Sequence, residues 1–125
     1  LSGDGRYLSV TSHQDTIDFF DIGRPQSPRH LWRRALVDSC PVVAQEISPT
    51  GRFLAYHAWS FTRRQVDLHV ISRDGAEVGV VRHAEKYPID GLQFVDDRYL
   101  LEGVYGSRMG TTVVALLYDL DAVAH

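Results

Sequence analysis

The sequence contains little cysteine and little lysine, and both shortages limit what the protein can be. Cys40 is the only cysteine, so no disulfide can form within the chain and the fold must rest on packing. A single cysteine fits a reducing compartment without excluding an oxidising one, which favours the cytoplasm and leaves the periplasm open. Lys86 is the only lysine among 13 basic residues, and the arginines are scattered, which is more typical of genome composition than of a binding patch.

Long apolar runs and long runs of like charge are absent as well. The longest strongly apolar run covers residues 113–118 and is far too short to cross a bilayer. Residues 1–5 carry neither the basic region nor the apolar core of a signal peptide. The formal net charge of -3 argues against binding to nucleic acid or a membrane surface through bulk electrostatics. We therefore expect no nucleic-acid partner and no membrane span.

A short motif recurs at a constant spacing of 46 residues. Residues 1–8 read LSGDGRYL and residues 47–54 read ISPTGRFL, so Arg6 and Arg52 occupy matching positions. A third Arg-aromatic-Leu triplet begins at Arg98, behind a shorter turn that lacks the glycine. Self-similarity at a period of about 40–50 residues is typical of tandem β-sheet repeats. The copies cover about residues 1–40, 41–87 and 88–125.

One complete copy predicts four strands. In the second copy, segments 42–47, 53–60, 65–72 and 77–83 are rich in β-branched and aromatic residues and are bounded by Gly, Pro, Asp and Ser. The first copy lacks the first strand and the third copy lacks the last, so we expect ten strands. Residues 121–125 are too short to count as a helix. The aromatic residues of the triplets, Tyr7, Phe53 and Tyr99, recur with the repeat, which predicts packing between sheets.

These features predict an all-β fold of about three tandem four-stranded antiparallel β-propeller blades, the outer two incomplete. Closed propellers have about four to eight blades, so ten strands cannot close such a ring. Three explanations remain open: a fragment of a larger propeller, several chains that assemble into a ring, or a neighbouring protein that completes it. We favour the fragment, because the sequence does not begin with methionine.

Residues 47–56, ISPTGRFLAY, resemble the turn and strand of TolB-like and WD40-like bacterial propeller repeats. Residues 1–8 resemble them too, whereas the third copy departs at residues 95–98. The resemblance covers essentially the whole chain and implies a propeller fold, and it is nearly silent on function. Such propellers serve as binding platforms, as gating domains of prolyl-oligopeptidase-like serine peptidases, and as sensor domains of signalling or defence proteins.

Residues with catalytic or metal-binding chemistry do not form a known pattern. None of the six histidines forms a His-x-His or His-x-x-x-His pair, and we expect them at the surface or in grooves between blades. His57 and His69 lie on adjacent predicted strands and could approach each other. The chain has no Gly-x-Ser-x-Gly elbow, and Cys40 is typical of a small packed residue. We predict no catalytic residue, no metal and no cofactor in this chain.

The candidate contact residues lie in two loops of successive copies. Tryptophan and arginine are enriched in binding hot spots, and they gather with phenylalanine in residues 59–64. The candidates are Trp59, Phe61, Arg63 and Arg64, together with Ser107 and Arg108 in the corresponding loop of the next copy. The alternative is that Trp59 merely closes the edge of its sheet.

The sequence therefore favours a non-catalytic interaction or scaffold module. Its partner would be a protein or peptide, or the rest of its own propeller. Two other functions stay open: the gating domain of a larger enzyme such as a prolyl-oligopeptidase-like serine peptidase, and the sensor domain of a bacterial signalling or defence protein.

Overall fold

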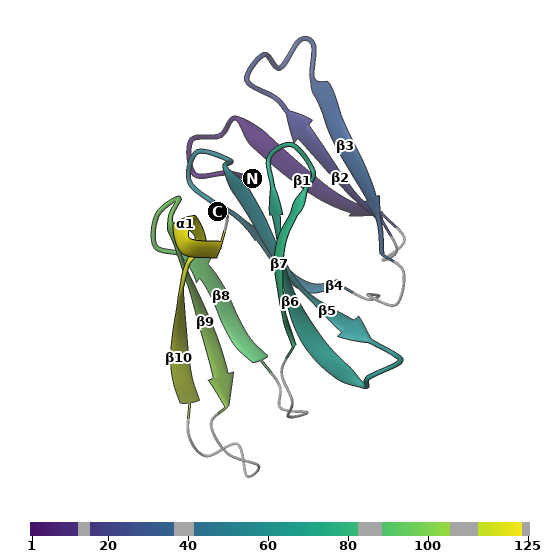
Figure 1. Cartoon of the computed structure of the whole chain (residues 1–125). Coiled ribbons are helices and arrows are strands. Elements are labelled where there is room, and N and C mark those ends of the chain that lie inside the picture. Colours follow the sequence, from purple (N-terminus) through teal and green to yellow (C-terminus); the bar gives the residue numbers. More distant parts are fainter. Residues whose placement is uncertain (13–15, 37–41, 83–88, 106–112, 124–125) are drawn as a thin grey trace.

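The chain folds into three antiparallel β-sheets that lie one behind another (Figure 1). The computed structural model describes residues 1–12, 16–36, 42–82, 89–105 and 113–123. Each sheet is a meander in which every strand pairs with its neighbours in sequence. The first sheet contains β1 (Tyr7–Ser12), β2 (Thr16–Asp21) and β3 (Arg29–Ala35). The middle sheet contains β4 (Val42–Ile47), β5 (Phe53–Ser60), β6 (Gln65–Ser72) and β7 (Glu77–Arg82). The third contains β8 (Ile89–Phe94), β9 (Tyr99–Tyr105) and β10 (Val113–Asp119).

The predicted all-β class and the positions of the strands are confirmed. In the middle sheet each strand begins and ends within one residue of its predicted bounds. The prediction that no helix forms near the C-terminus is wrong, because β10 runs directly into the one-turn helix α1 (Leu120–Val123). Asp119 accounts for this turn, since its Oδ1 accepts a hydrogen bond from the N–H of Asp121 at 3.1 Å and so caps the helix.

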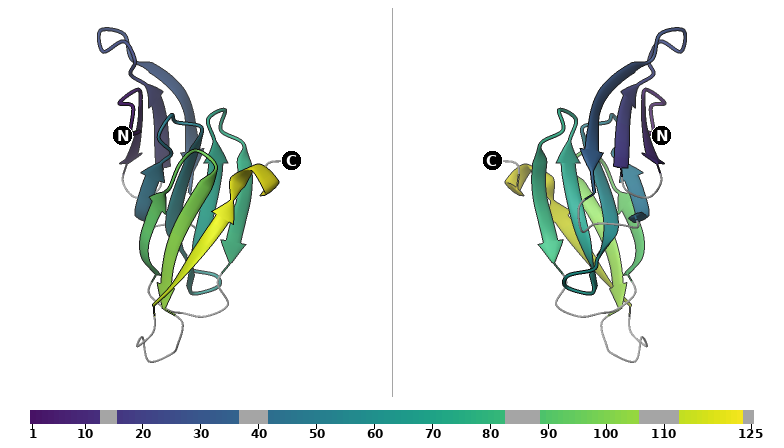
Figure 2. Two further views of the ribbon diagram at one scale, coloured as in Figure 1. Left: turned by 90° about the vertical axis from the view of Figure 1, so that its left-hand side faces the viewer. Right: turned by 90° about the vertical axis from the view of Figure 1, so that its right-hand side faces the viewer.

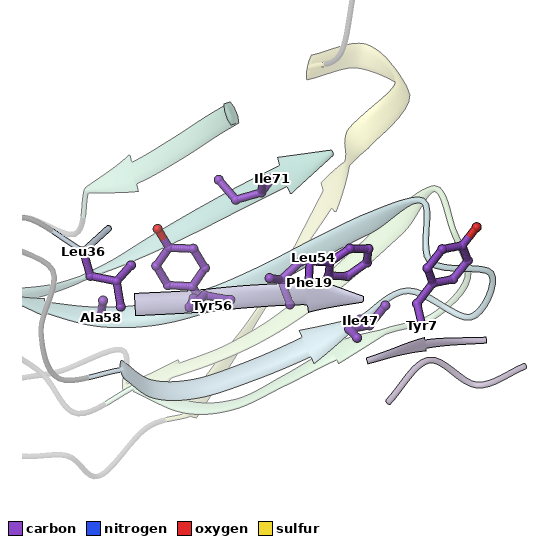
Figure 3. Packing of buried hydrophobic residues seen from close by; sticks show 9 residues of the cluster. Tyr7, Phe19, Leu36, Ile47, Leu54, Tyr56, Ala58 and Ile71 are labelled. Carbon is purple, nitrogen blue, oxygen red and sulfur yellow. The ribbon is translucent and has the colours of Figure 1, made fainter. Parts of the chain in front are cut away.

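The middle sheet is covered on both faces, as the two side views in Figure 2 show. Side chains alternate between the faces of a strand. The face toward the first sheet forms one apolar cluster with it, drawn in Figure 3: Tyr7, Ile17, Phe19, Leu36, Ile47, Leu54, Tyr56, Ala58 and Ile71. The opposite face forms a second cluster with the third sheet: Phe53, Ala55, Leu68, Val70, Phe94, Leu100 and Leu120. The two neighbours therefore bury both faces of the middle sheet.

The repeated motif folds into the same turn in the first two copies. Ser2 and Ser48 each accept, through Oγ, a hydrogen bond from the backbone N–H of the aromatic residue that follows, at 2.9 and 3.0 Å. Gly5 and Gly51 have φ angles of 75° and 77°, in the left-handed region that glycine adopts freely. In the third copy Asp96 replaces this arrangement, since its Oδ1 accepts hydrogen bonds from two following N–H groups at 2.8 Å.

Aromatic rings of the first sheet rest on glycines of the middle sheet. Tyr7 occupies the space above Gly51 so fully that a Cβ there would lie 2.1 Å from its ring. Trp32 lies in the same way against Gly75, where a Cβ would lie 3.2 Å away. Phe19 stacks between the two rings, at 5.7 and 5.1 Å between centroids. The recurring aromatic positions thus pack between sheets in the first two copies, as predicted.

Within the described ranges, the structure contains no helix long and apolar enough to cross a membrane.

Replacing Gly51 by alanine should strongly destabilise the fold, whereas the same change at Gly5 should cost little. Gly51→Ala combines a strained left-handed backbone with a clash against Tyr7, so we expect a loss of about 3 kcal/mol in the free energy of unfolding. Gly5 has the same turn with nothing within 4 Å of a Cβ, so Gly5→Ala should cost about 1 kcal/mol. Urea denaturation of both variants in dilute solution measures the difference, and equal losses would contradict the packing described here.

Candidate functional site

The predicted contact segment 59–64 is a tight turn and not an extended loop. Trp59 and Ser60 belong to β5, and Trp59 pairs with Val66 of β6 across the hairpin. Trp59 is therefore half-buried against its own sheet. Phe61 is 64% exposed, and Arg64 completes the turn with a φ angle of 54°. The surface that this turn offers to a partner consists chiefly of Phe61 and Arg64.

Arg63 holds the turn in place. Its guanidinium forms an ion pair with the carboxylate of Asp67, which is 1% exposed. Gln65 donates a hydrogen bond to the same carboxylate at 3.1 Å, and Ser60 accepts one from the N–H of Arg63 at 3.2 Å. Since a buried carboxylate is costly without a cation beside it, the role of Arg63 here is structural.

Two of the predicted contact residues, Ser107 and Arg108, lie outside the described residues. The proposed pairing of loops between successive copies therefore stays a prediction.

The histidines of β5 and β6 do not come together. In the antiparallel register His57 pairs with Leu68, whereas His69 pairs with Tyr56. Successive side chains point to opposite faces, so His57 faces the third sheet and His69 faces the first. Nor are they at the surface, since they are 1% and 8% exposed. Among the residues that the structure describes, no group of three or more His, Cys, Asp or Glu side chains could hold a metal ion.

A buried polar cluster joins the middle and third sheets. His57 Nε2 lies 2.5 Å from Oε2 of Glu102, which is fully buried. The hydroxyl of Tyr118 donates a hydrogen bond to Oε1 of Glu102 at 2.8 Å. Burial, together with the neighbouring carboxylate, raises the pKa of Tyr118. Glu102 belongs to no sequence motif, although it stands 46 residues after Tyr56 and so at the same position of the repeat.

A second polar cluster joins the first and middle sheets. Arg34 donates hydrogen bonds to the hydroxyl of Tyr56 at 3.1 Å and to Oε1 of Glu77 at 3.0 Å. The imidazole of His69 stacks on Tyr56 and bonds to Glu77 through Nδ1 at 3.1 Å. Burial lowers the pKa of His69 below its ordinary value of 6.5 and raises the pKa of Tyr56. Both rings are therefore neutral near pH 7.

Arg6, Arg52 and Arg98 occupy matching corners of the three sheets. Each guanidinium lies over the ring of the aromatic residue that follows it, at 5.3, 4.8 and 5.1 Å. Hydrogen bonds from Arg6 lower the pKa of Asp21, and those from Arg98 lower the pKa of Asp119.

Arg52 departs from this pattern in its acidic partner. The position across from its triplet is Ser72 and not an aspartate. Arg52 bonds instead to Asp121 in α1 of the third sheet, at 2.7 Å. The motif that identified the repeat in the sequence therefore also links two sheets.

An open groove of about 910 Å³ lies beside Arg52, at the end of the middle sheet opposite the 61–64 turn. Its size falls within the range of ligand pockets. One wall comes from β3 and the other from the β4–β5 and β6–β7 turns with the strands beside them. Its lining combines apolar side chains with charges of both signs: Leu31, Trp32, Thr50, Arg52, Phe53, Ser72, Arg73, Asp74, Ala76, Glu77 and Val78.

The groove was missed in the sequence because Trp32 does not recur with the repeat. Its indole N–H donates to the backbone carbonyl of Arg73 at 2.9 Å, across the two sheets. Arg73 in turn donates to the carbonyls of Gly51 and Thr50, at 3.2 and 2.9 Å. Trp32 and Arg73 belong to different copies of the repeat, so a pattern within one copy cannot predict this groove.

No family model and no curated protein matches the chain.

His69 makes the stability of the fold depend on pH. Because its pKa is lowered in the folded state, the unfolded state binds the proton first as the pH falls below 6.5, and stability is lost in that window. We expect His69→Leu to lose less stability than the wild type between about pH 7.5 and about pH 5.5. Urea denaturation at both pH values tests this, and equal losses in the two proteins would contradict the burial of this imidazole.

Proposed function

We propose that the chain is a non-catalytic interaction module that binds a segment of a protein or a peptide in the groove beside Trp32. The observation that carries this proposal is the groove itself, in which Trp32, Arg52 and Arg73 surround an open space of about 910 Å³. Tryptophan and arginine are the residues most enriched where binding energy concentrates.

The groove suits a partner with an apolar anchor. Its cationic groups already have partners, because Arg52 pairs with Asp121 and Arg73 bonds to backbone carbonyls. Preorganised polar groups orient a ligand without further ordering cost, while Leu31 and Val78 offer apolar surface. A segment that places a large apolar side chain between these walls fits best.

The framework of this module we propose to be a set of TolB-like propeller blades. The 46-residue repeat, the matching corners of Arg6, Arg52 and Arg98, and the face-to-face packing of three sheets support this assignment. Sheets that stack in this way leave their turns at two opposite ends, where loops can vary without disturbing the core.

The turn at the opposite end is a second candidate surface. Phe61 is a large apolar side chain that is 64% exposed, and Arg64 in the same turn is exposed as well. Exposed aromatic and arginine side chains are typical of contact surfaces.

A selected peptide should distinguish the two surfaces. Peptides from a displayed random library, selected on the chain, should bind saturably in a calorimetric titration. Ala76→Arg places a long side chain in the groove at an exposed position, and we expect it to weaken binding about tenfold or more. Phe61→Ala is the matched control and should leave the affinity unchanged.

If Phe61→Ala weakens binding and Ala76→Arg does not, the peptide binds at the 61–64 turn, and the proposal that it binds in the groove is refuted. The absence of any saturable binding would refute the interaction module. Circular dichroism of both variants establishes that they are folded.

A further inference from the structure

The first and third sheets each have one outer face that no other sheet among the described residues covers. In the other copies of the repeat, the equivalent face packs against a neighbouring sheet. The leading face is the side of the first sheet that points away from the middle sheet, and it carries Leu8, Val10 and Phe20. The trailing face is the outer side of the third sheet, and it carries Tyr99, Leu101 and Leu117. Strand alternation defines both faces, because Tyr7 and Leu100 point inward to the apolar clusters.

Apolar residues on these two faces are more exposed than the residues at the same repeat position in the other copies. Val10 is 39% exposed, whereas Tyr56 at the same position of the next copy is 1% exposed. Leu117 is 60% exposed, whereas the equivalent Phe19 and Val70 are 0% and 5% exposed. Within the chain, a neighbouring sheet covers each of the equivalent positions. The leading and trailing faces are thus the surfaces that a further sheet of this repeat would cover.

An unfilled glycine and a half-exposed aromatic ring stand at opposite ends of the stack. Between the first and middle sheets, the Tyr7 ring fills the space above Gly51. Gly5 forms the same turn at the same φ, but nothing lies within 4 Å of its Cβ position. Tyr99 is the third-copy equivalent of Tyr7, and it lies on the trailing face. The chain therefore carries one free half of this contact at each end.

The residue that covers the ring is also in place. Arg73 lies over the Tyr7 ring at 4.8 Å, and Leu120 shares an apolar cluster with Phe53. Both residues directly follow the end of a strand. The backbone N–H of each donates a hydrogen bond to the backbone carbonyl of the arginine in the triplet of the same copy. Ile22 makes the same backbone hydrogen bond in the first sheet, so it stands where a cover for Tyr99 is needed.

We propose that a second copy of this chain docks head to tail, with its Tyr99 seated over Gly5 and under Ile22 of the first copy. Leu101 and Leu117 of the trailing face then pack against Leu8 and Val10 of the leading face. A second copy fits as the occupant because this chain itself carries both halves of the contact. Such an interface is heterologous, because two different surfaces meet.

The buried acidic group of the leading face already has its partners within the chain. Asp18 is this buried acidic residue, and it forms an ion pair with Arg33 and a hydrogen bond with His30, both at 2.8 Å. Because the carboxylate is already paired, covering it removes no unpaired charge from water. The groove beside Trp32 lies between the first and middle sheets and takes no part, so the proposal is independent of peptide binding.

Sedimentation velocity over a range of concentrations tests the proposal on the full chain. The wild type should associate reversibly. Gly5→Asn keeps a residue that tolerates a left-handed backbone and fills the space above the turn, and Leu117→Asp charges the trailing face. We expect each change to weaken association about tenfold or more. Phe61→Asp, which charges an equally exposed apolar residue far from both faces, is the control and should associate as the wild type does.

Mixing the two variants identifies the head-to-tail arrangement. Gly5→Asn retains an intact trailing face and Leu117→Asp retains an intact leading face, so the mixture should form a one-to-one dimer that neither variant forms alone. A wild type that stays monomeric at about 100 μM, variants that associate normally, or a mixture without the heterodimer would each overturn the proposal. Circular dichroism and urea denaturation establish that the variants are folded.

Discussion

The contact of the Tyr7 ring with Gly51 is the constraint on which the stacking of the first two sheets depends. An aromatic ring can approach the backbone this closely only where no Cβ intervenes, and the turn of Gly51 also needs a positive φ that glycine adopts freely. The same residue type therefore serves the local turn and the contact between sheets. Trp32 on Gly75 repeats the arrangement at the β6–β7 turn of the middle sheet.

Polar side chains determine which faces meet. Both interfaces between sheets contain hydrogen-bonded side chains, such as Arg34 with Tyr56 in one and His57 with Glu102 in the other. A buried carboxylate without its partner would cost several kcal/mol, so a slipped or exchanged pairing of sheets is penalised. The apolar clusters supply most of the favourable free energy, because each fully buried Leu, Ile or Phe contributes roughly 1.5–3 kcal/mol. The polar pairs favour one relative position of neighbouring sheets. The groove beside Trp32 depends on that position, because its walls come from the first and middle sheets.

Candidate sites that rest on adjacent residues could be predicted from the sequence, whereas a site formed by different copies of the repeat could not. Adjacent aromatic and arginine residues around Trp59 predicted a contact loop. In the structure Trp59 is half-buried in the β5–β6 hairpin, and Arg63 forms an ion pair with Asp67. The groove escaped notice because its walls come from different copies of the repeat. The adjacent predicted strands left open that His57 and His69 approach each other, but the alternation of side chains along two paired strands sends them to opposite faces.

The sequence by itself determined the strands, the turns and the period of the repeat, because strand alternation, turn glycines and the Arg-aromatic-Leu triplet are properties of a few consecutive residues. The tertiary structure alone decided which faces are covered, where the groove opens, and that Glu102 is buried against His57. Those outcomes depend on side chains from different sheets, such as Trp32 and Arg73, which stand 41 residues apart in the chain. Only the packing of whole sheets brings such residues together, and no local pattern encodes it.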